Sequence, residues 1–245
     1  MQTVALHHTA IRETVMKIGT TESKSMTHPQ KQSAEIQIDI VSDVMCPWCI
    51  IGFRQLEQAL GATGTAAYVR WHPFELNPQM PPAGQNLQEH ITGKYNVSAE
   101  QSAQNRAQMQ ALGGDLGIDF QFSGDSRIVN TFAAHQLLDW AQEQGLQHPL
   151  KLALFEAHFT QERDVSWHEV LVQVAAEVGL DGAEARAVLA DGRRGTQTRA
   201  QQQFWTSKGI VGVPAMVFDG KYLLTGAQGA PNYAQMVQKV VADRV

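Results

Sequence analysis

The pattern of apolar and polar positions predicts a strand, a helix and a second strand at the start of the folded region. Residues 36–41 alternate between apolar and polar side chains and then become apolar, which is typical of a strand entering a sheet. Apolar residues then recur at helical spacing from Ile50 to Leu60. Residues 66–71 again favour a strand, and a proline-rich segment follows them.

The middle of the chain has a different pattern. From about Leu87 to Ser207 the apolar spacing is helical almost throughout, and glycine and proline interrupt it without strand-like alternation. One of these helices is expected to begin with Ser166 as N-cap, because Glu169 follows three residues later in a capping-box spacing. This stretch therefore predicts a helical region of its own.

Strand character returns near the C-terminus. The apolar run 213–218, the turn Asp219-Gly220 and the run 221–224 together predict an antiparallel hairpin, and an amphipathic helix that begins near Pro231 follows it. The order is thus βαβ, a long helical stretch, then ββα.

This order divides the chain into three parts. We expect residues 1–34 to form a disordered leader, since polar residues dominate there. Residues 35–80 and 208–245 are predicted to form one discontinuous α/β domain. Residues 81–207 are predicted to form an inserted helical domain between its halves.

Composition and charge exclude several classes of protein. The chain has 245 residues, of which 43% are hydrophobic and 18% charged, as in globular proteins. Its net charge of −5 gives no electrostatic reason to expect nucleic acid or an anionic membrane as partner. No apolar run reaches the roughly 18 residues of a membrane helix, and no secretory signal is evident. We therefore expect a cytoplasmic location, or a periplasmic one if a signal peptide has been removed.

The only two cysteines are Cys46 and Cys49. Two cysteines cannot build a disulfide framework or complete a four-ligand zinc site, so no metal is expected. Their C-x-x-C spacing lies between a predicted strand and a predicted helix, where free N–H groups favour a thiolate and should lower the pKa of Cys46. Cys49, about one turn later, can reach that sulfur and resolve a mixed disulfide. Pro47 suits the first turn of the helix.

The sequence Cys46-Pro47-Trp48-Cys49 after the first strand, together with Gly212-Val213-Pro214 before a late strand, resembles the thioredoxin fold with its cis-proline. With the helical block between the two halves, the chain resembles the DsbA family. Residues 42–52, 130–135, 209–214 and 225–228 are similar to its FrnE-like branch. The resemblance covers residues 35–245. It implies an α/β thioredoxin fold (βαβ…ββα) with a large inserted all-helical domain.

The resemblance also implies how substrate is held. The Val213-Pro214 bond is expected to be cis, with Pro214 against the active thiol and the backbone of Val213 offered to an extended substrate. Trp48 is expected to be an exposed contact surface beside Cys46. The remaining tryptophans are expected in the core: Trp71, Trp140, Trp167 and Trp205.

Three further residues are candidates for supporting roles. Many thioredoxin-like proteins carry a buried carboxylate six positions before the nucleophile, where this chain has Ile40. Asp39 should face the other side of the strand, so Asp43 is the better candidate, with a turn or cap role as its alternative. Asn130 is expected to cap its helix. His135 either lines the cleft near the thiols or is a buried core histidine.

These residues predict a thiol–disulfide oxidoreductase that acts on protein or small-molecule disulfides by thiolate exchange. Its partners would be a disulfide- or dithiol-containing molecule and an external thiol reductant or oxidant. A reducing compartment favours reduction or isomerisation over bulk oxidation.

Two alternatives remain open at this point. One is a glutathione-dependent isomerase or transferase, similar to 2-hydroxychromene-2-carboxylate isomerases and kappa-class transferases, in which glutathione would be a co-substrate. The active position of those enzymes is typically a serine, whereas this chain has Cys46 with a partner thiol. The other is a peptide-binding chaperone that uses the cleft around Trp48 and Pro214. No other cofactor is expected.

Overall fold

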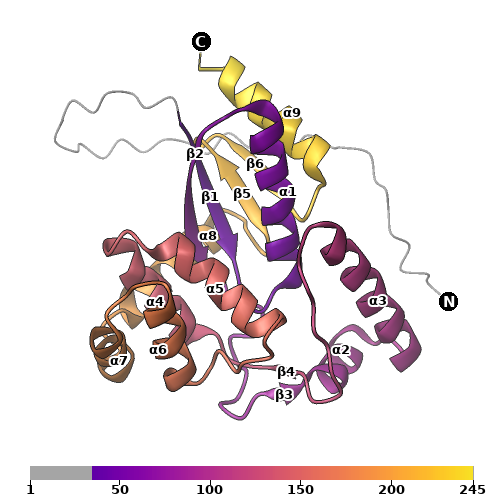
Figure 1. Cartoon of the computed structure of the whole chain (residues 1–245), viewed down its shortest axis with the longest axis vertical. Helices are drawn as coiled ribbons and strands as arrows, with labels where there is room; N and C mark the ends of the chain where they lie inside the picture. Colours follow the sequence, from indigo (N-terminus) through magenta and orange to yellow (C-terminus); the bar gives the residue numbers. More distant parts are fainter. Residues whose placement is uncertain (1–34, 245) are drawn as a thin grey trace.

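A four-stranded sheet with helices on both faces forms one end of the molecule, and a mainly helical region forms the other (Figure 1). The computed structural model describes residues 35–244, so the leader predicted for residues 1–34 lies outside the described residues. None of the helices between residues 35 and 244 combines the length and hydropathy that a membrane span requires.

The sheet joins the two ends of the chain in the order β2-β1-β5-β6. Helix α1 (Pro47–Thr63) connects the parallel pair β1 and β2, and the hairpin of β5 and β6 lies antiparallel on the other side of β1. The predicted order βαβ…ββα is therefore confirmed, and helix α9 (Ala230–Ala242) closes it. The strands are β1 (Ile36–Ser42), β2 (Ala67–Pro73), β5 (Ala215–Phe218) and β6 (Tyr222–Thr225).

Alternation along β1 explains which helices cover each face. Ile36, Ile38 and Ile40 are fully buried in a cluster with residues of α1 and α9. Val41 points to the other face and packs with Trp205 of α8 (Gly195–Ser207). Successive side chains of a strand alternate between faces, so one apolar strand can support both layers.

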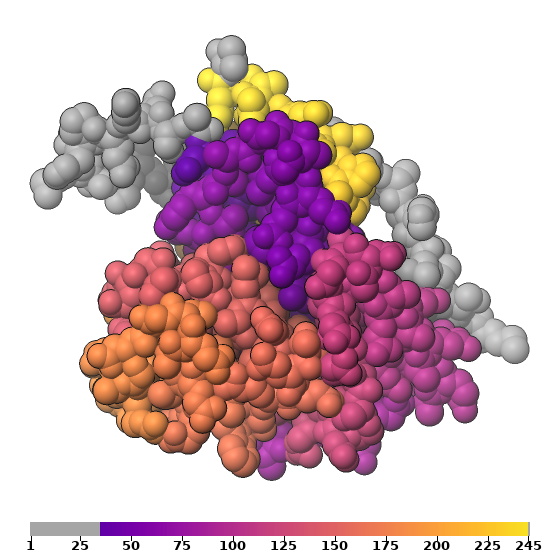
Figure 2. Space-filling view, viewed as in Figure 1, coloured from indigo at the N-terminus to yellow at the C-terminus, as the bar shows by residue number. Residues whose placement is uncertain are grey.

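The insertion is helical apart from one short two-stranded ladder, β3 with β4, which the sequence did not predict. The predicted domain limits, 80/81 and 207/208, fall between β2 and β3 and between α8 and β5. Figure 2 shows α2–α3 and α4–α7 as neighbouring masses at the same end of the sheet. The elements are β3 (Gln85–Asn86), α2 (Leu87–Tyr95), α3 (Ala99–Asp115), β4 (Arg127–Ile128), α4 (Phe132–Glu143), α5 (Gln147–Phe159), α6 (His168–Glu177) and α7 (Gly182–Asp191).

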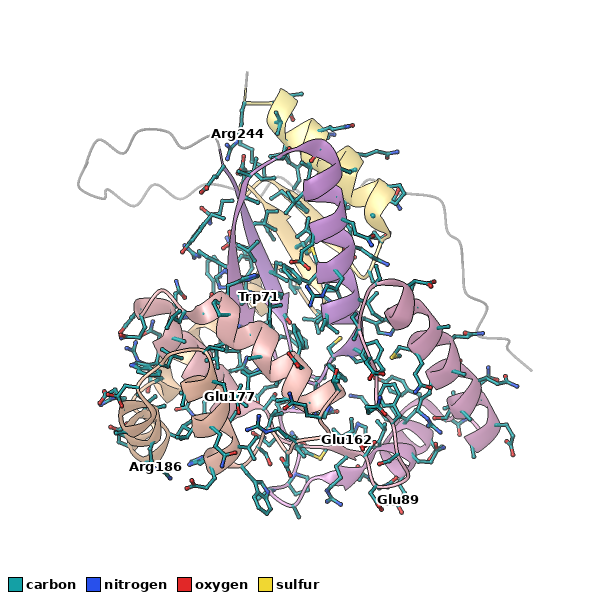
Figure 3. All side chains as sticks on the ribbon, in the orientation of Figure 1. Trp71, Glu89, Glu162, Glu177, Arg186 and Arg244 are labelled. Atoms are coloured by element: carbon teal, nitrogen blue, oxygen red, sulfur yellow. The ribbon has the colours of Figure 1, made fainter. Side chains whose placement is uncertain are left out.

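Helix α5 belongs to both hydrophobic cores. Leu150 and Leu154 pack in the core of the helical insertion, whereas Phe155 and Phe159 pack in the cluster of the sheet and α1. Trp71 of β2 lies where these parts meet (Figure 3). Because α5 is buried on two sides, a polar residue on it can face the sheet domain instead of solvent.

Two local predictions around the start of α6 are wrong. Trp167 is 64% exposed, in contrast to Trp71, Trp140 and Trp205, which are buried as predicted. Trp167 is also the N-cap residue in place of Ser166, whose hydroxyl donates to Asp164. The side chain of Asp164 accepts both the N–H and the hydroxyl of Ser166, so the expected capping box does not form.

Candidate active site

The two cysteines lie where β1 leads into α1. Cys46 is the N-cap of α1 in an extended conformation, and Pro47 occupies its first turn. The N–H of Cys49 donates to the carbonyl of Cys46 at 3.0 Å. Both are free thiols, with Cys46 3% exposed and Cys49 fully buried. The motif therefore has the strand-to-helix position that the sequence predicted.

The loop before β5 meets this helix end. The Val213–Pro214 peptide bond is cis, as predicted. The thiol of Cys46 donates a long hydrogen bond to the carbonyl of Val213, at 3.7 Å between sulfur and oxygen, across 167 residues of sequence. Trp48 is 42% exposed, in line with the expected contact surface. The residues predicted to hold substrate thus lie beside the thiol.

Gly52 lets the proline loop approach α1 closely. A Cβ at this position would lie 3.2 Å from the hydroxyl of Tyr233, 3.3 Å from Cγ of Pro214 and 3.4 Å from Cε of Met216. Such separations are tighter than ordinary contacts between heavy atoms. Glycine therefore lets the cis-proline loop pack closely on α1, and a side chain here would require its neighbours to shift.

We expect Gly52→Val to lower the free energy of unfolding by about 2 kcal/mol, because overpacked sites typically lose 1–3 kcal/mol. Gly61→Val in the same helix is the matched control, since no heavy atom lies within 4 Å of a Cβ there. Urea denaturation measures both variants. Equal free energies of unfolding in the two variants would show that the close approach of Gly52 to Pro214 does not affect stability.

Asp43 is a buried carboxylate directly before the thiols. It accepts the N–H of Leu76 at 2.7 Å and that of Met45 at 3.3 Å, and Nε2 of His135 lies 3.5 Å from its Oδ1. Burial favours the neutral acid, but the contact with His135 and the backbone donor of Leu76 hold the pKa of Asp43 below its ordinary value. The structure thus places a fixed negative charge here instead of an acid poised near neutral pH.

The other two supporting candidates, Asn130 and His135, have structural partners. Asn130 accepts the N–H of Phe132 at 2.9 Å, which fits the expected cap role at the start of α4. His135 is buried beside Asp43, as the core-histidine interpretation has it. Asp39 lies on the other face of β1, where it contacts His72 at 2.7 Å and Arg70 at 3.3 Å.

Lys151 of α5 is a further residue near the thiols, and the sequence did not predict it. This side chain is 1% exposed, and its ammonium lies 4.7 Å from the ring centre of Phe155 and 5.4 Å from that of Trp71. Burial lowers the pKa of Lys151 to about 8, against the opposing influence of Cys49 and Asp43. The sequence does show a single lysine within an apolar helical run, which could have indicated a buried charge. Such a lysine normally extends its ammonium to solvent, so the pattern alone did not predict burial.

The two thiols titrate as one coupled pair. The hydrogen bond with Cys49 and burial raise the pKa of Cys46. Burial also opposes ionisation of Cys49, but hydrogen bonds with Cys46 and Ser42 and the charge of Lys151 lower the pKa of Cys49. The predicted low pKa of Cys46 is wrong for the dithiol, because the helix-end argument leaves out burial and the second sulfur.

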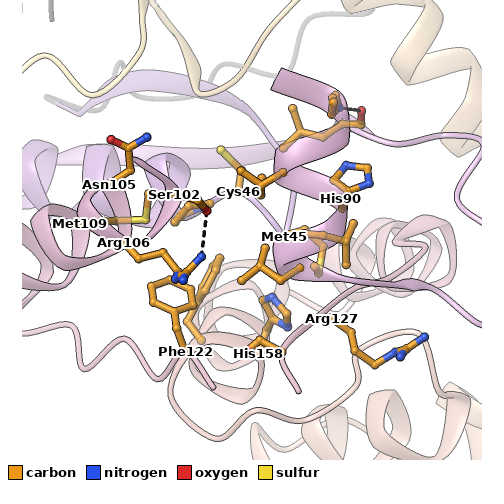
Figure 4. Close-up of a pocket in the computed structure, with 18 of the residues that line it drawn as sticks. Met45, Cys46, His90, Ser102, Asn105, Arg106, Met109, Phe122, Arg127 and His158 are labelled. Atoms are coloured by element: carbon orange, nitrogen blue, oxygen red, sulfur yellow. Dashed lines mark hydrogen bonds between the residues drawn. The ribbon is translucent and has the colours of Figure 1, made fainter. Parts of the chain in front are cut away.

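A cavity of about 1430 Å³ opens beside Cys46. Cys46, Trp48 and Val213 form one part of its wall, and α2, α3 and the loop before β4 form the facing part (Figure 4). No cluster of three or more potential metal ligands occurs within residues 35–244. The apolar side chains of the facing wall include Leu87, Ile91, Met109, Leu112 and Phe122.

Comparison with known proteins agrees with this geometry. The family model of the DSBA-like thioredoxin domain matches residues 37–238. The uncharacterized protein YwbO of Bacillus subtilis (strain 168) is 25% identical over 213 residues, which are 85% of this chain and 96% of YwbO.

Solved structures show the same fold. The probable DsbA oxidoreductase SCO1869 from Streptomyces coelicolor is 32% identical, with a TM-score of 0.81, over 86% of this chain and 92% of that one. The cytosolic disulfide reductase DsbM from Pseudomonas aeruginosa, solved with GSH, is 17% identical, with a TM-score of 0.57, over 85% of this chain and 100% of that one. The predicted thioredoxin fold with an inserted helical domain is thereby confirmed, and the chain belongs to the DSBA-like thioredoxin domain family.

Proposed function

We propose that this protein is a thiol–disulfide oxidoreductase that exchanges its Cys46–Cys49 pair with disulfides of proteins or small molecules. One observation carries the proposal: two free thiols lie one helical turn apart at the start of α1, with the cis Val213–Pro214 loop against the first of them. Family membership supports the same chemistry.

Cys46 is the nucleophile in this mechanism, because it lines the cavity whereas Cys49 is fully buried. As a disulfide approaches, Cys46 loses to solvent the proton that its thiol donates to the carbonyl of Val213. The resulting Cys46 thiolate lies at the N-terminus of α1, where backbone N–H groups stabilise negative charge. It attacks one substrate sulfur, the substrate S–S bond breaks, and a mixed disulfide forms.

Cys49 then resolves the mixed disulfide. It attacks the sulfur of Cys46, its proton passes to the leaving substrate thiolate, and the pair ends as a Cys46–Cys49 disulfide. Two electrons have moved from the pair to the substrate, and an external thiol returns them. Ser42 and the charge of Lys151 favour the attacking form of Cys49.

The substrate chain would lie along the cis-proline loop. The backbone of Val213 faces Cys46 and can pair with an extended segment in the manner of an added strand. Trp48 supplies an exposed aromatic surface beside it. We further propose a cytoplasmic location, where a reducing thiol pool favours reduction or isomerisation.

The test is to trap the intermediate. Cys49→Ala is expected to accumulate a mixed disulfide between Cys46 and a model protein disulfide, because the resolving sulfur is gone. Mass spectrometry of the non-reduced protein detects the adduct. The control is Cys46→Ala, which keeps Cys49 but should form none. An adduct on Cys49 alone, or none in either variant, would contradict the assigned roles.

A glutathione-dependent isomerase is the second candidate, because the cavity beside Cys46 has room for glutathione and a small substrate together. It predicts that turnover survives in Cys49→Ala, since only one thiol is needed. A chaperone role predicts that suppression of aggregation survives replacement of both cysteines. Disulfide exchange that is lost in Cys49→Ala favours the oxidoreductase.

A further inference from the structure

A guanidinium without a carboxylate partner points into the cavity beside Cys46. Arg106 lies on the face of α3 that also carries Ser102 and Met109, and its side chain extends toward Phe122 of the same wall (Figure 4). Ser102 is among the few buried residues of α3, so this face is the inner one. The charge of Arg106 is therefore directed into the space where a substrate of Cys46 would lie.

The hydrogen bonds of Arg106 go to neutral groups. Its Nη1 donates to Oε1 of Gln88 at 2.6 Å and to the hydroxyl of Ser102 at 2.9 Å. A guanidinium has five N–H donors, and the others make no hydrogen bond to residues 35–244. The side-chain nitrogen of Gln88 is buried and also finds no acceptor within the described range. Arg106 and Gln88 therefore offer hydrogen-bond donors that no carboxylate of residues 35–244 accepts.

Two of the three carboxylates that line the same cavity have other partners, and the third, Asp125, makes no ion pair with Arg106. Glu162 accepts the hydroxyls of Ser123 at 2.8 Å and Ser126 at 2.9 Å, and Asp164 accepts the hydroxyl of Ser166 at 2.6 Å. No ion pair joins Arg106 to any carboxylate between residues 35 and 244. The positive charge of Arg106 is thus not neutralised by the protein itself in this part of the chain.

Two other cations of this wall also contact neutral oxygens. Lys94 donates to the carbonyl of Leu76 at 3.1 Å and to the side chain of Asn77 at 2.7 Å. Arg127 donates to the carbonyl of Ala83. An anionic ligand would therefore be attracted to this part of the cavity, and Arg106 is the least exposed of the three cations.

We propose that Arg106, with Gln88 and Ser102, forms a subsite for a substrate carboxylate. The preferred substrate is then a disulfide whose polypeptide carries a Glu or Asp near the reacting cysteine. This inference rests on the proposed function and names the substrate class of that site. A carboxylate fits a guanidinium through two parallel hydrogen bonds, and partial burial strengthens them.

The size of the cavity favours a peptide over a small disulfide. Its volume of about 1430 Å³ exceeds the roughly 300–1,000 Å³ of pockets for small ligands. A segment of extended chain could contact Val213 with its backbone and still place a side chain at Arg106. Because a small disulfide such as oxidised glutathione also carries carboxylates, the experiment compares both sources.

The test measures kcat/KM for reduction of matched peptide disulfides that carry Glu or Gln at one to four residues from the cysteine. For the best spacing we expect the wild type to prefer Glu by about tenfold, mainly through KM. Arg106→Gln should reduce this preference to about twofold or less, and Arg106→Lys should retain part of it, since lysine keeps the charge without the planar fork. Oxidised glutathione and its diester form the second pair of substrates.

The Gln peptide gives the baseline of each variant, so the preference is taken as the ratio of kcat/KM for the Glu and Gln peptides within one variant, and circular dichroism checks the fold. Arg186→Gln is the matched surface control: Arg186 pairs with Glu169 on α6 and lies on the other side of the insertion (Figure 3). No Glu preference in the wild type, or an unchanged preference in Arg106→Gln, overturns the subsite. A preference only for glutathione over its diester assigns the carboxylate to the small disulfide and overturns the peptide assignment. If the wild type reduces none of these disulfides, the proposed function itself is contradicted.

Discussion

Replacement of Cys46 by serine is expected to lower disulfide reduction by at least about a thousandfold, since a hydroxyl does not ionise near neutral pH and forms no mixed disulfide. Serine is close to cysteine in size, and the site is 3% exposed, so the fold should be retained. The long hydrogen bond to the carbonyl of Val213 can also be kept by a hydroxyl. A loss of activity in Cys46→Ser would therefore come from the missing thiol and not from unfolding.

The measurement is steady-state reduction of a model protein disulfide by an external dithiol, with circular dichroism to check the fold. Cys49→Ser is the matched control, because it should lose multiple turnover and keep a single stoichiometric attack by Cys46. Activity of Cys46→Ser above a tenth of the wild-type rate would assign the first attack to another group.

Replacement of Lys151 by methionine is expected to stabilise the fold near neutral pH by about 3 kcal/mol, because a pKa of about 8 lies some 2.5 units below the ordinary 10.5. Below pH 8 the lysine is charged in both the folded and the unfolded state, so the folded state carries the full cost of burying it. Between pH 8 and 10.5 the unfolded state binds more protons, and the stability of the parent protein rises with pH. Methionine has a similar shape without the charge.

Urea denaturation at pH 7 and pH 10.5 measures this difference. Both proteins should carry Cys46→Ser and Cys49→Ser, so that no thiol titrates in the window. Because the charge of Cys49 raises the pKa of Lys151, this background lowers that pKa further, and a third measurement at about pH 5 covers the fully charged lysine. We expect the methionine variant to be more stable at pH 7 and the difference to vanish at pH 10.5. Equal stabilities at both values would mean that the ammonium of Lys151 reaches water.

The same substitution should alter the redox chemistry when the cysteines are present. Lys151 helps to lower the pKa of Cys49, so its removal should raise that pKa. The reduced, dithiol form then becomes less stable relative to the disulfide form. A rise of one unit in the pKa of Cys49 corresponds to a shift of about 30 mV in the reduction potential, in the direction of a more reducing pair. Equilibration against glutathione measures the potential, and an unchanged potential would remove Lys151 from the redox site.

The sequence predicted the fold well because its signals are local. The alternation along β1, the helical spacing after Cys49 and the turn at Asp219-Gly220 each arise within a few residues. Errors occurred where a competing local contact decided the outcome. Asp164 takes the hydrogen bonds of Ser166, and the N-cap of α6 moves to the exposed Trp167.

The partners of the thiols were less predictable. Asp43 could be named from its place before the motif, but its contacts with Leu76 and His135 come from distant segments. Lys151 and Arg106 resemble ordinary surface residues of helices in the sequence. Their roles depend on which side of α5 and α3 faces the site, and a helical pattern alone leaves that open.

By itself the sequence determined that this protein has one pair of thiols, at a strand-to-helix junction, in a thioredoxin-like order of elements. These properties follow from spacing along the chain, where one helical turn brings Cys46 and Cys49 together. Only the tertiary structure decided which groups surround the pair and shift its pKa values. Electrostatics in a buried site depend on distance in space, and the sheet and α5 bring Lys151 and the thiols together from segments far apart in sequence.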